Sequence, residues 1–118
     1  MPFLNLDDNF ADHPKVDALS DGAFRLHVSG LLYCSRNKTD GFVPLDRLPR
    51  LMPRYRKAYL TELIDGRLWY TRPGEQVEAH DYLDWNKSRE QIDSDRERIR
   101  KARSDAGKKG ANARWHTA

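Results

Sequence analysis

The chain has 118 residues, enough for one compact domain and a short extension. Hydrophobic residues make up 38% of it and charged residues 33%, so we expect part of the chain to lie outside a folded core. The single cysteine, Cys34, excludes an internal disulfide framework and a cysteine-rich zinc site. No apolar run approaches the roughly 18 residues of a membrane span, and the acidic N-terminus lacks the basic start of a secretory signal. We therefore expect a cytoplasmic protein that does not contact a membrane.

The charge of the chain is unevenly distributed. Residues 1–95 contain 13 Lys and Arg against 16 Asp and Glu, a net charge of −3, whereas residues 96–118 contain 8 against 2, a net charge of +6. A basic segment of this kind commonly binds a polyanion, because neutralising phosphates releases condensed counterions. The alternative interpretation is a solvated face that keeps the protein in solution.

Two helices are predicted in the first third of the chain. Pro14 lies where proline is tolerated in a helix's first turn, and a short helix is expected to continue over residues 15–19. Ser20 can cap a second helix over residues 21–36. Its apolar residues form two stripes at helical spacing, one of Phe24, Val28, Leu31 and Leu32 and the other of Leu26, Gly30 and Tyr33. This pattern predicts a scaffold helix buried on two sides, with Cys34 as an ordinary core residue.

Two short helices joined by a tight turn are predicted next. Residues 45–52 have apolar side chains at helical spacing, and Pro49 is compatible with a helix only near its first turn. Pro53 interrupts the chain, and residues 54–65 resume the helical pattern until Gly66 caps the end. This arrangement is typical of a helix-turn-helix.

A β-hairpin follows the pair of helices. Residues 68–72 and 76–82 are rich in aromatic and β-branched residues and flank a Pro-Gly-Glu turn at residues 73–75. Phe42 and Val43 form a strand too short to stand alone, so we expect it to pair with this hairpin. A hairpin in this position corresponds to the wing of a winged helix.

The C-terminal part of the chain is predicted to be a basic helix. Residues 88–91 (Ser-Arg-Glu-Gln) have the spacing of a capping box, so a helix should begin there and continue to about Gly107. Its few apolar residues are too sparse for a coiled coil. The predicted fold is therefore α+β, mainly α, with a winged helix-turn-helix domain over residues 1–85, a basic helix over 86–107 and a flexible basic tail over 108–118.

Candidate DNA contacts cluster at the start of the second helix of the pair. A helix that enters the major groove presents its first turn and its positive pole to DNA. Arginine can bond guanine through two hydrogen bonds, while tyrosine and lysine reach phosphate oxygens. The predicted contacts are Arg54, Tyr55, Arg56 and Lys57 in the first turn, Arg50 in the preceding turn, and Arg72 beside the hairpin tip. A solvated helix start is the alternative interpretation of the cluster.

The basic extension is the second group of candidate contacts. Its cations could follow the phosphate backbone and add affinity without distinguishing base sequences. The residues assigned to this role are Arg96, Arg100, Lys101, Arg103, Lys108 and Lys109.

Five stretches of the sequence are similar to a known family: residues 12–16 (Asp-His-Pro-Lys-Val), 39–44 (Thr-Asp-Gly-Phe-Val-Pro), 66–69 (Gly-Arg-Leu-Trp), 80–86 (His-Asp-Tyr-Leu-Asp-Trp-Asn) and 88–91. In these stretches the chain resembles the small winged helix-turn-helix proteins of actinobacterial phages and prophages, which are akin to the N-terminal domains of phage replisome organisers. The resemblance extends from about residue 3 to residue 110. It implies a winged-helix fold and a role in the DNA transactions of a mobile element, in either transcription or replication.

The sequence favours DNA binding over other classes of function. The four histidines have neither the two-apart nor the four-apart spacing of common metal motifs, and no convergent reactive set appears, so we expect no enzyme, metal or cofactor. The main alternative is a module that binds a host or phage replication or transcription protein, because winged helices also bind proteins and residues 1–95 are net acidic. RNA binding is a weaker alternative. A homodimer that reads paired half-sites on DNA stays open.

Overall fold

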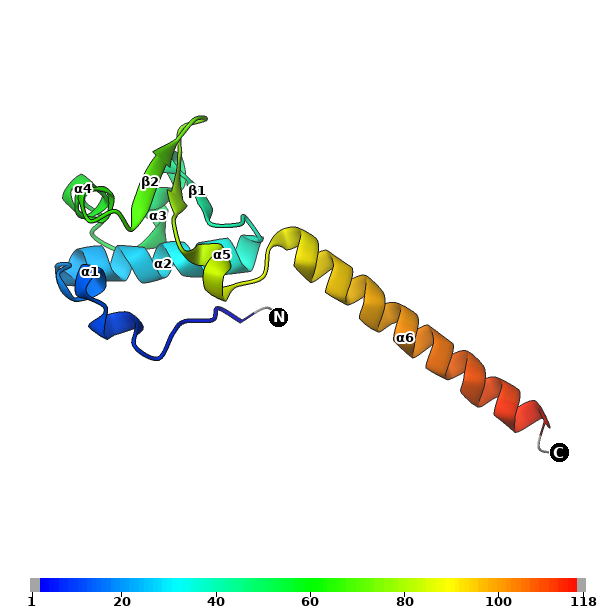
Figure 1. Cartoon of the computed structure of the whole chain (residues 1–118). Helices are drawn as coiled ribbons and strands as arrows, with labels where there is room; N and C mark the ends of the chain where they lie inside the picture. Colours follow the sequence, from blue (N-terminus) through cyan, green and yellow to red (C-terminus); the bar gives the residue numbers. More distant parts are fainter. Residues whose placement is uncertain (1–2, 117–118) are drawn as a thin grey trace. The chain divides into compact units, whose positions relative to one another are not determined.

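The computed structural model describes the backbone of residues 3–116 and the side chains of residues 3–107. The chain divides into two compact units, a body of Met1–Ser88 and a second unit of Arg89–Ala118. The body contains short helices and a small sheet, and the second unit contains one helix, α6 (Figure 1). Among the described residues, no helix has both the length and the apolar character needed to span a membrane.

The body is α+β and mainly helical, with a three-stranded antiparallel sheet. Its strands lie in the order β1-β3-β2, so the short strand β1 pairs with the second strand of the β2–β3 hairpin, as its length required. The elements of the body are η1 (Phe10–Asp12), α1 (Pro14–Asp17), α2 (Asp21–Asn37), β1 (Phe42–Pro44), η2 (Leu45–Arg47), α3 (Leu48–Leu51), α4 (Lys57–Asp65), β2 (Trp69–Arg72), β3 (Gln76–Ala79) and α5 (Tyr82–Trp85).

Helix α2 is the scaffold of the body, but its buried face differs from the two stripes that the sequence predicted. The residues buried on it are Ala23, Leu26, His27, Gly30, Leu31, Cys34 and Ser35. Phe24 and Val28 are only partly buried, and Leu32 is 45% exposed. The core forms on the side where Gly30 lets the ring of Trp69 approach the helix. Cys34 is fully buried, as predicted, and burial raises the pKa of its thiol to about 11.

The start of α2 is fastened to α4 by a serine and a glutamate. The Ser20 hydroxyl oxygen accepts a hydrogen bond from the Ala23 backbone N–H at 3.3 Å, which caps the helix. The backbone N–H and the hydroxyl of Ser20 donate to the two carboxylate oxygens of Glu62, at 3.0 and 2.6 Å. These bonds hold the pKa of Glu62 below its ordinary value, the hydroxyl contributing most. Glu62, to which the sequence assigned no role, therefore joins the two helices.

A buried histidine connects α2 to the sheet. His27 is 5% exposed, and its Nδ1 accepts a hydrogen bond of 2.8 Å from the Trp69 indole N–H. The ring of Phe10 stacks on His27 with ring centroids 5.4 Å apart. Burial lowers the pKa of His27 to about 4, and the nearby Asp81 carboxylate only partly opposes that shift. His27 is therefore neutral at pH 7.

Two boundaries in the C-terminal half correct the sequence prediction. The strand expected to continue to Tyr82 ends at Ala79, because the chain turns at Asp81 and Tyr82 enters the core at the start of α5.

Helix α6 is Arg89–His116, so it continues beyond the predicted end at Gly107. The helix can continue past Gly107 because glycine lowers helix propensity but keeps its backbone N–H donor. No proline interrupts α6, since the last proline of the sequence is Pro73. Ion pairs of Arg98 with Asp95 and Arg100 with Glu97, both 2.6 Å, support this helix.

Replacing Gly30 by alanine is expected to destabilise the body. A Cβ atom there would lie 2.4 Å from Cζ2 of Trp69, whose ring is fully buried and cannot retreat. Such overpacking typically costs about 1–3 kcal/mol, which outweighs the gain of about 1 kcal/mol in helix propensity. Urea unfolding should report the loss. The matched control is Gly107→Ala in α6, where a Cβ meets nothing within 4 Å, and an unchanged midpoint for Gly30→Ala would contradict the packing described.

The stability of the body is expected to fall in mild acid through His27. The unfolded chain takes up a proton on this side chain near pH 6.5, whereas the folded chain does so only near pH 4. The stabilising contribution is present above pH 6.5 and is lost as the pH falls toward 4, in total about 3 kcal/mol. His27→Gln keeps an acceptor for Trp69 but cannot titrate, so its urea-unfolding free energy should fall less between pH 7 and pH 4.5. Equal pH dependence in both proteins would refute this assignment, and His80→Gln, at an exposed position, is the control.

Candidate nucleic-acid interface

Residues 47–57 form a basic segment that connects η2, α3 and the start of α4. It contains five basic residues and no acidic residue. We call these residues the basic turn: Arg47, Arg50, Arg54, Arg56 and Lys57. All five are exposed, and no ion pair involves any of them among the residues whose side chains are described. The segment is therefore a patch of uncompensated positive charge on a body that is net acidic.

The second helix of the pair begins later than the sequence predicted. Met52 has an extended backbone, as expected for a residue before proline, and Arg54 adopts a left-handed backbone with φ of 58°. Arg56 is the N-cap of α4, which begins at Lys57. Arg54, Tyr55 and Arg56 therefore lie in the turn before α4 and not in its first helical turn, because Pro53 and the left-handed Arg54 postpone the helix.

Tyr55 differs from the cations around it. It is partly buried and packs against the hydrophobic core, and this burial raises the pKa of its phenol. The sequence placed it among the DNA contacts, but its ring anchors the turn to the core. That anchor holds the neighbouring Arg54 and Arg56 side chains at the surface.

The N-terminus of α4 is free to attract an anion. Arg56 provides no side-chain cap to the helix, and the first turn contains no acidic residue. The unpaired backbone N–H groups and the helix dipole place partial positive charge there, next to three basic side chains. Glu62, the one glutamate of α4, is held by Ser20 on α2. Phosphate is the kind of group that such an arrangement binds best.

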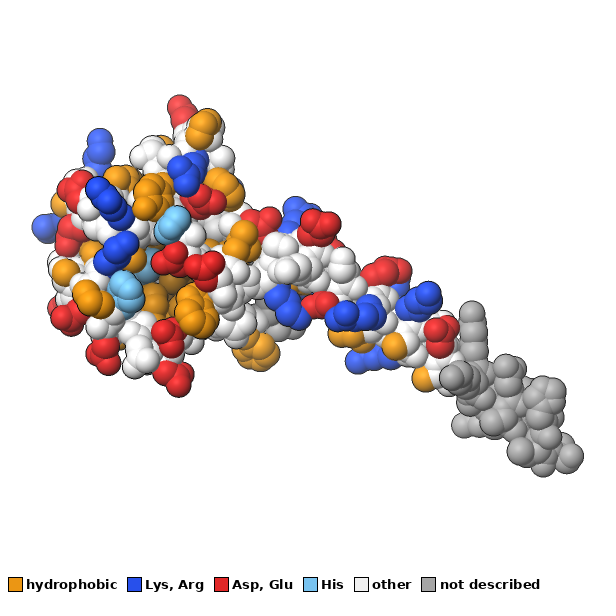
Figure 2. Space-filling model, viewed as in Figure 1, with side chains coloured by type: hydrophobic (Ala, Val, Ile, Leu, Met, Phe, Trp, Pro, Cys, Tyr) orange, Lys and Arg blue, Asp and Glu red, His pale blue; other side chains and the backbone are white. Residues whose placement is uncertain are grey.

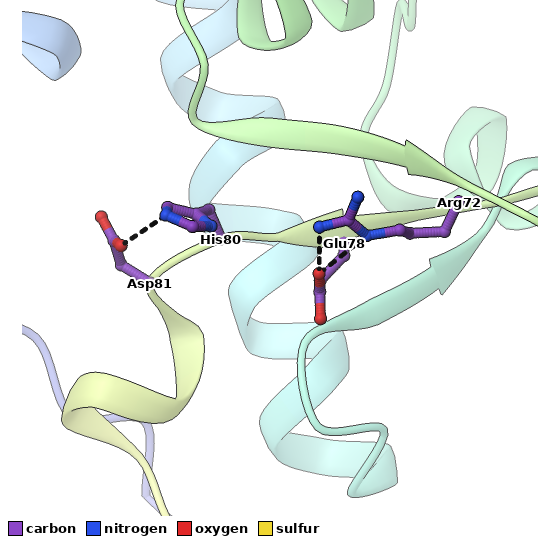
Figure 3. A network of polar contacts seen from close by, with 4 residues as sticks. All are labelled: Arg72, Glu78, His80 and Asp81. Carbon is purple, nitrogen blue, oxygen red and sulfur yellow. Dashed lines mark hydrogen bonds and ion pairs between the residues drawn. The ribbon is translucent and has the colours of Figure 1, made fainter.

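The hairpin tip carries little positive charge. Arg72 Nη2 and Nε both lie 2.9 Å from Glu78 Oε1 (Figure 3). The guanidinium carbon of Arg72 is 5.2 Å from the centroid of the Tyr70 ring. The tip itself exposes Glu75. A phosphate would have to compete with Glu78 for Arg72, so the structure gives this predicted contact a partner within the sheet.

Helix α6 presents part of its predicted cationic track on one face. Arg96, Arg100 and Arg103 fall within about a sixth of the helix circumference, and Lys101 lies about 100° from Arg100. Arg96, Lys101 and Arg103 are exposed and have no ion-pair partner among the described side chains, whereas Arg100 pairs with Glu97. Lys108 and Lys109 belong to the helical backbone of α6, but their side chains lie outside the described residues.

One member of the basic turn escaped the sequence prediction. Arg47 lies at the end of η2, before the predicted turn, and was not assigned to the DNA contacts. The signal that could have identified it is the absence of any acidic residue between Asp46 and Glu62.

Among the side chains of residues 3–107, no group of three His, Cys, Asp or Glu is arranged to hold a metal ion.

Comparisons with protein-family models, with curated proteins and with solved structures found no match to this chain.

Proposed function

We propose that this protein binds double-stranded DNA through the basic turn and the N-terminus of α4, in the manner of a winged helix-turn-helix protein. The observation that carries the proposal is the basic turn: five exposed cations without a described ion-pair partner, adjoining an uncapped helix N-terminus. Phosphate contacts supply most of the affinity of DNA-binding proteins, and helix N-termini are common donors to them.

The late start of α4 divides the contacts into two kinds. Arg54 and Arg56 flank the helix entrance, where they would bind phosphates on either side of a groove. The exposed residues Lys57, Ala58 and Thr61 would face the base edges, as the first turns of recognition helices do. Thr61 Oγ donates to the Lys57 carbonyl at 3.2 Å, which leaves its methyl group available for apolar contact with a base. Contacts to the phosphate backbone of the DNA would therefore dominate over contacts to its base edges.

The sheet order supports the winged-helix interpretation. A hairpin directly after α4, with β1 added beside β3, is compatible with the wing of that fold. Because Arg72 is bonded to Glu78 and Glu75 is exposed, the wing would touch DNA weakly and the basic turn would carry the contact. The resemblance to phage winged-helix proteins adds transcription or replication of a mobile element to the proposal.

A second candidate function is binding to another protein through the opposite kind of surface. Four large hydrophobic side chains of the body are substantially exposed near its N-terminus and on α5: Phe3 at 84%, Leu6 at 41%, Leu83 at 49% and Trp85 at 56%. Exposed apolar and aromatic side chains of this kind fit a protein partner better than DNA. The two functions involve different residues and can be tested separately.

Replacing Arg54 and Arg56 by alanine is expected to weaken duplex binding by at least about tenfold at low salt. Two lost phosphate contacts should also reduce the slope of log affinity against log salt by about 2. Fluorescence anisotropy with a labelled duplex at several salt concentrations measures both quantities. The matched control is Arg25→Ala with Arg36→Ala, which removes the same charge from exposed positions on α2. Equal losses in both double variants would leave only a non-specific charge effect and contradict the assigned interface.

The track on α6 is expected to contribute affinity without sequence preference. Changing Arg96, Arg100 and Arg103 together to glutamine keeps good helix formers and should reduce the salt slope by about 2–3, equally for unrelated duplexes. The same anisotropy titration, repeated with two duplexes of different sequence, measures the effect. Arg98→Gln is the control, because Arg98 lies on the other side of the helix and pairs with Asp95. An unchanged slope in the triple variant would remove α6 from the interface.

A further inference from the structure

The body contains a cavity of about 280 Å³ that the proposed DNA interface does not use. It lies between the N-terminal segment with α1, helix α2, Leu68 before β2, and the chain from the end of β3 through α5, so its lining comes from four parts of the sequence. Figure 2 shows a face of the body where histidine, acidic and hydrophobic side chains lie together, with Lys and Arg side chains beside them. None of the five residues of the basic turn lines the cavity.

One wall of the cavity is fastened by Asn86. Its Oδ1 accepts a hydrogen bond from the Asn5 backbone N–H at 2.8 Å, and its Nδ2 donates to the carbonyls of Asn5 and Tyr82 at 3.1 and 3.2 Å. Asn86 is 8% exposed. The N-terminal segment is therefore tied to α5 across a sequence separation of 81 residues, and the cavity has defined sides.

At the inner end of the cavity lies a hydrogen-bond donor without a partner. An indole N–H can only donate, so the Trp69 bond requires that Nδ1 of His27 be unprotonated and that the proton of the neutral ring reside on Nε2. His27 lines the cavity and is 5% exposed, and among the described residues Nε2 has no hydrogen-bond partner. Thr39 Oγ1 is the one side-chain nitrogen or oxygen atom of the described residues that is both buried and without a partner, so Nε2 of His27 keeps accessible surface and its N–H is open to an acceptor in the cavity.

The mouth of the cavity is acidic and aromatic. Asp7, Asp81 and Asp84 line it and are exposed, and Asp81 Oδ1 lies 3.7 Å from His80 Nε2 (Figure 3). Trp85 lines the same mouth and is 56% exposed. Carboxylates accept hydrogen bonds from amino groups and repel phosphates, while an exposed indole offers a flat surface for stacking.

We propose that this cavity binds a flat heteroaromatic amine without a phosphate group, of the kind represented by a free nucleobase. A ring nitrogen of the ligand accepts the His27 Nε2–H, an exocyclic amino group donates to a carboxylate at the mouth, and the ring lies against Trp85. At about 280 Å³ the cavity lies just below the usual range of ligand pockets, about 300–1,000 Å³, which suits a ligand with a single ring system. The proposal does not depend on DNA binding, since the two sites share no residue.

The first test is thermal unfolding and calorimetric titration of the full chain with adenine, purine and adenosine monophosphate. Adenine at ten times its dissociation constant should raise the midpoint by about 5–10 °C. Purine lacks the amino group and should bind at least about tenfold more weakly, because it loses a hydrogen bond to a carboxylate. The phosphate of adenosine monophosphate should weaken binding further. No binding of adenine at millimolar concentration, or equal binding of all three, would overturn the proposal.

The second test uses substitutions at the mouth, where the fold is not at risk. Asp84→Asn and Trp85→Ala should each weaken adenine binding about tenfold, whereas Asp8→Asn, an exposed acidic position outside the cavity, should not change it. Adenine binding that survives both substitutions would locate the ligand elsewhere and refute the assignment. Duplex binding measured on the same variants should stay unchanged, so that a failure of this proposal is distinguishable from a failure of the DNA interface.

Discussion

The packing of the Trp69 indole against α2 is the interaction on which the fold of the body depends. It comes from β2, is fully buried, lies against Gly30 of α2 and donates its N–H to His27 of the same helix. One side chain therefore sets both the distance between sheet and helix, through the absent Cβ of Gly30, and the rotation of the helix, through the hydrogen bond. The bond also requires that the proton of the neutral His27 ring reside on Nε2.

Basic and acidic side chains are exposed on different elements of the body. The core and the histidine occupy one side of α2, and Ser20 and Glu62 join α2 to α4, so the only glutamate of α4 is removed from the helix entrance. The basic turn then has no acidic neighbour between Asp46 and Glu62. The exposed acidic residues at the cavity mouth lie on other elements, Asp7 in the N-terminal segment and Asp84 on α5. The body therefore exposes a segment of basic side chains and, on other elements, a group of carboxylates.

Much of the fold was predictable from the sequence, because its signals are local. Ser20 capped α2 as expected, Pro49 lies in the first turn of α3, and the hairpin turns at residues 73–75. The errors arose where tertiary packing decides. Tyr82 enters the core and ends the strand early, Leu32 lies outside the buried face of α2, and the left-handed Arg54 postpones α4. The basic turn was largely predictable from composition. The role of His27 was not, because the Trp69 indole that donates to its Nδ1 is 42 residues away and only folding brings them together.

The most direct test of the central claim is to map the surface that duplex DNA contacts, using backbone amide chemical-shift changes of the labelled full chain during a titration at low salt. We expect the largest changes to fall on residues 47–61, around the basic turn and the first turns of α4, and to reverse when salt is added. Changes concentrated instead around the cavity and α5, or no changes at all, would contradict it.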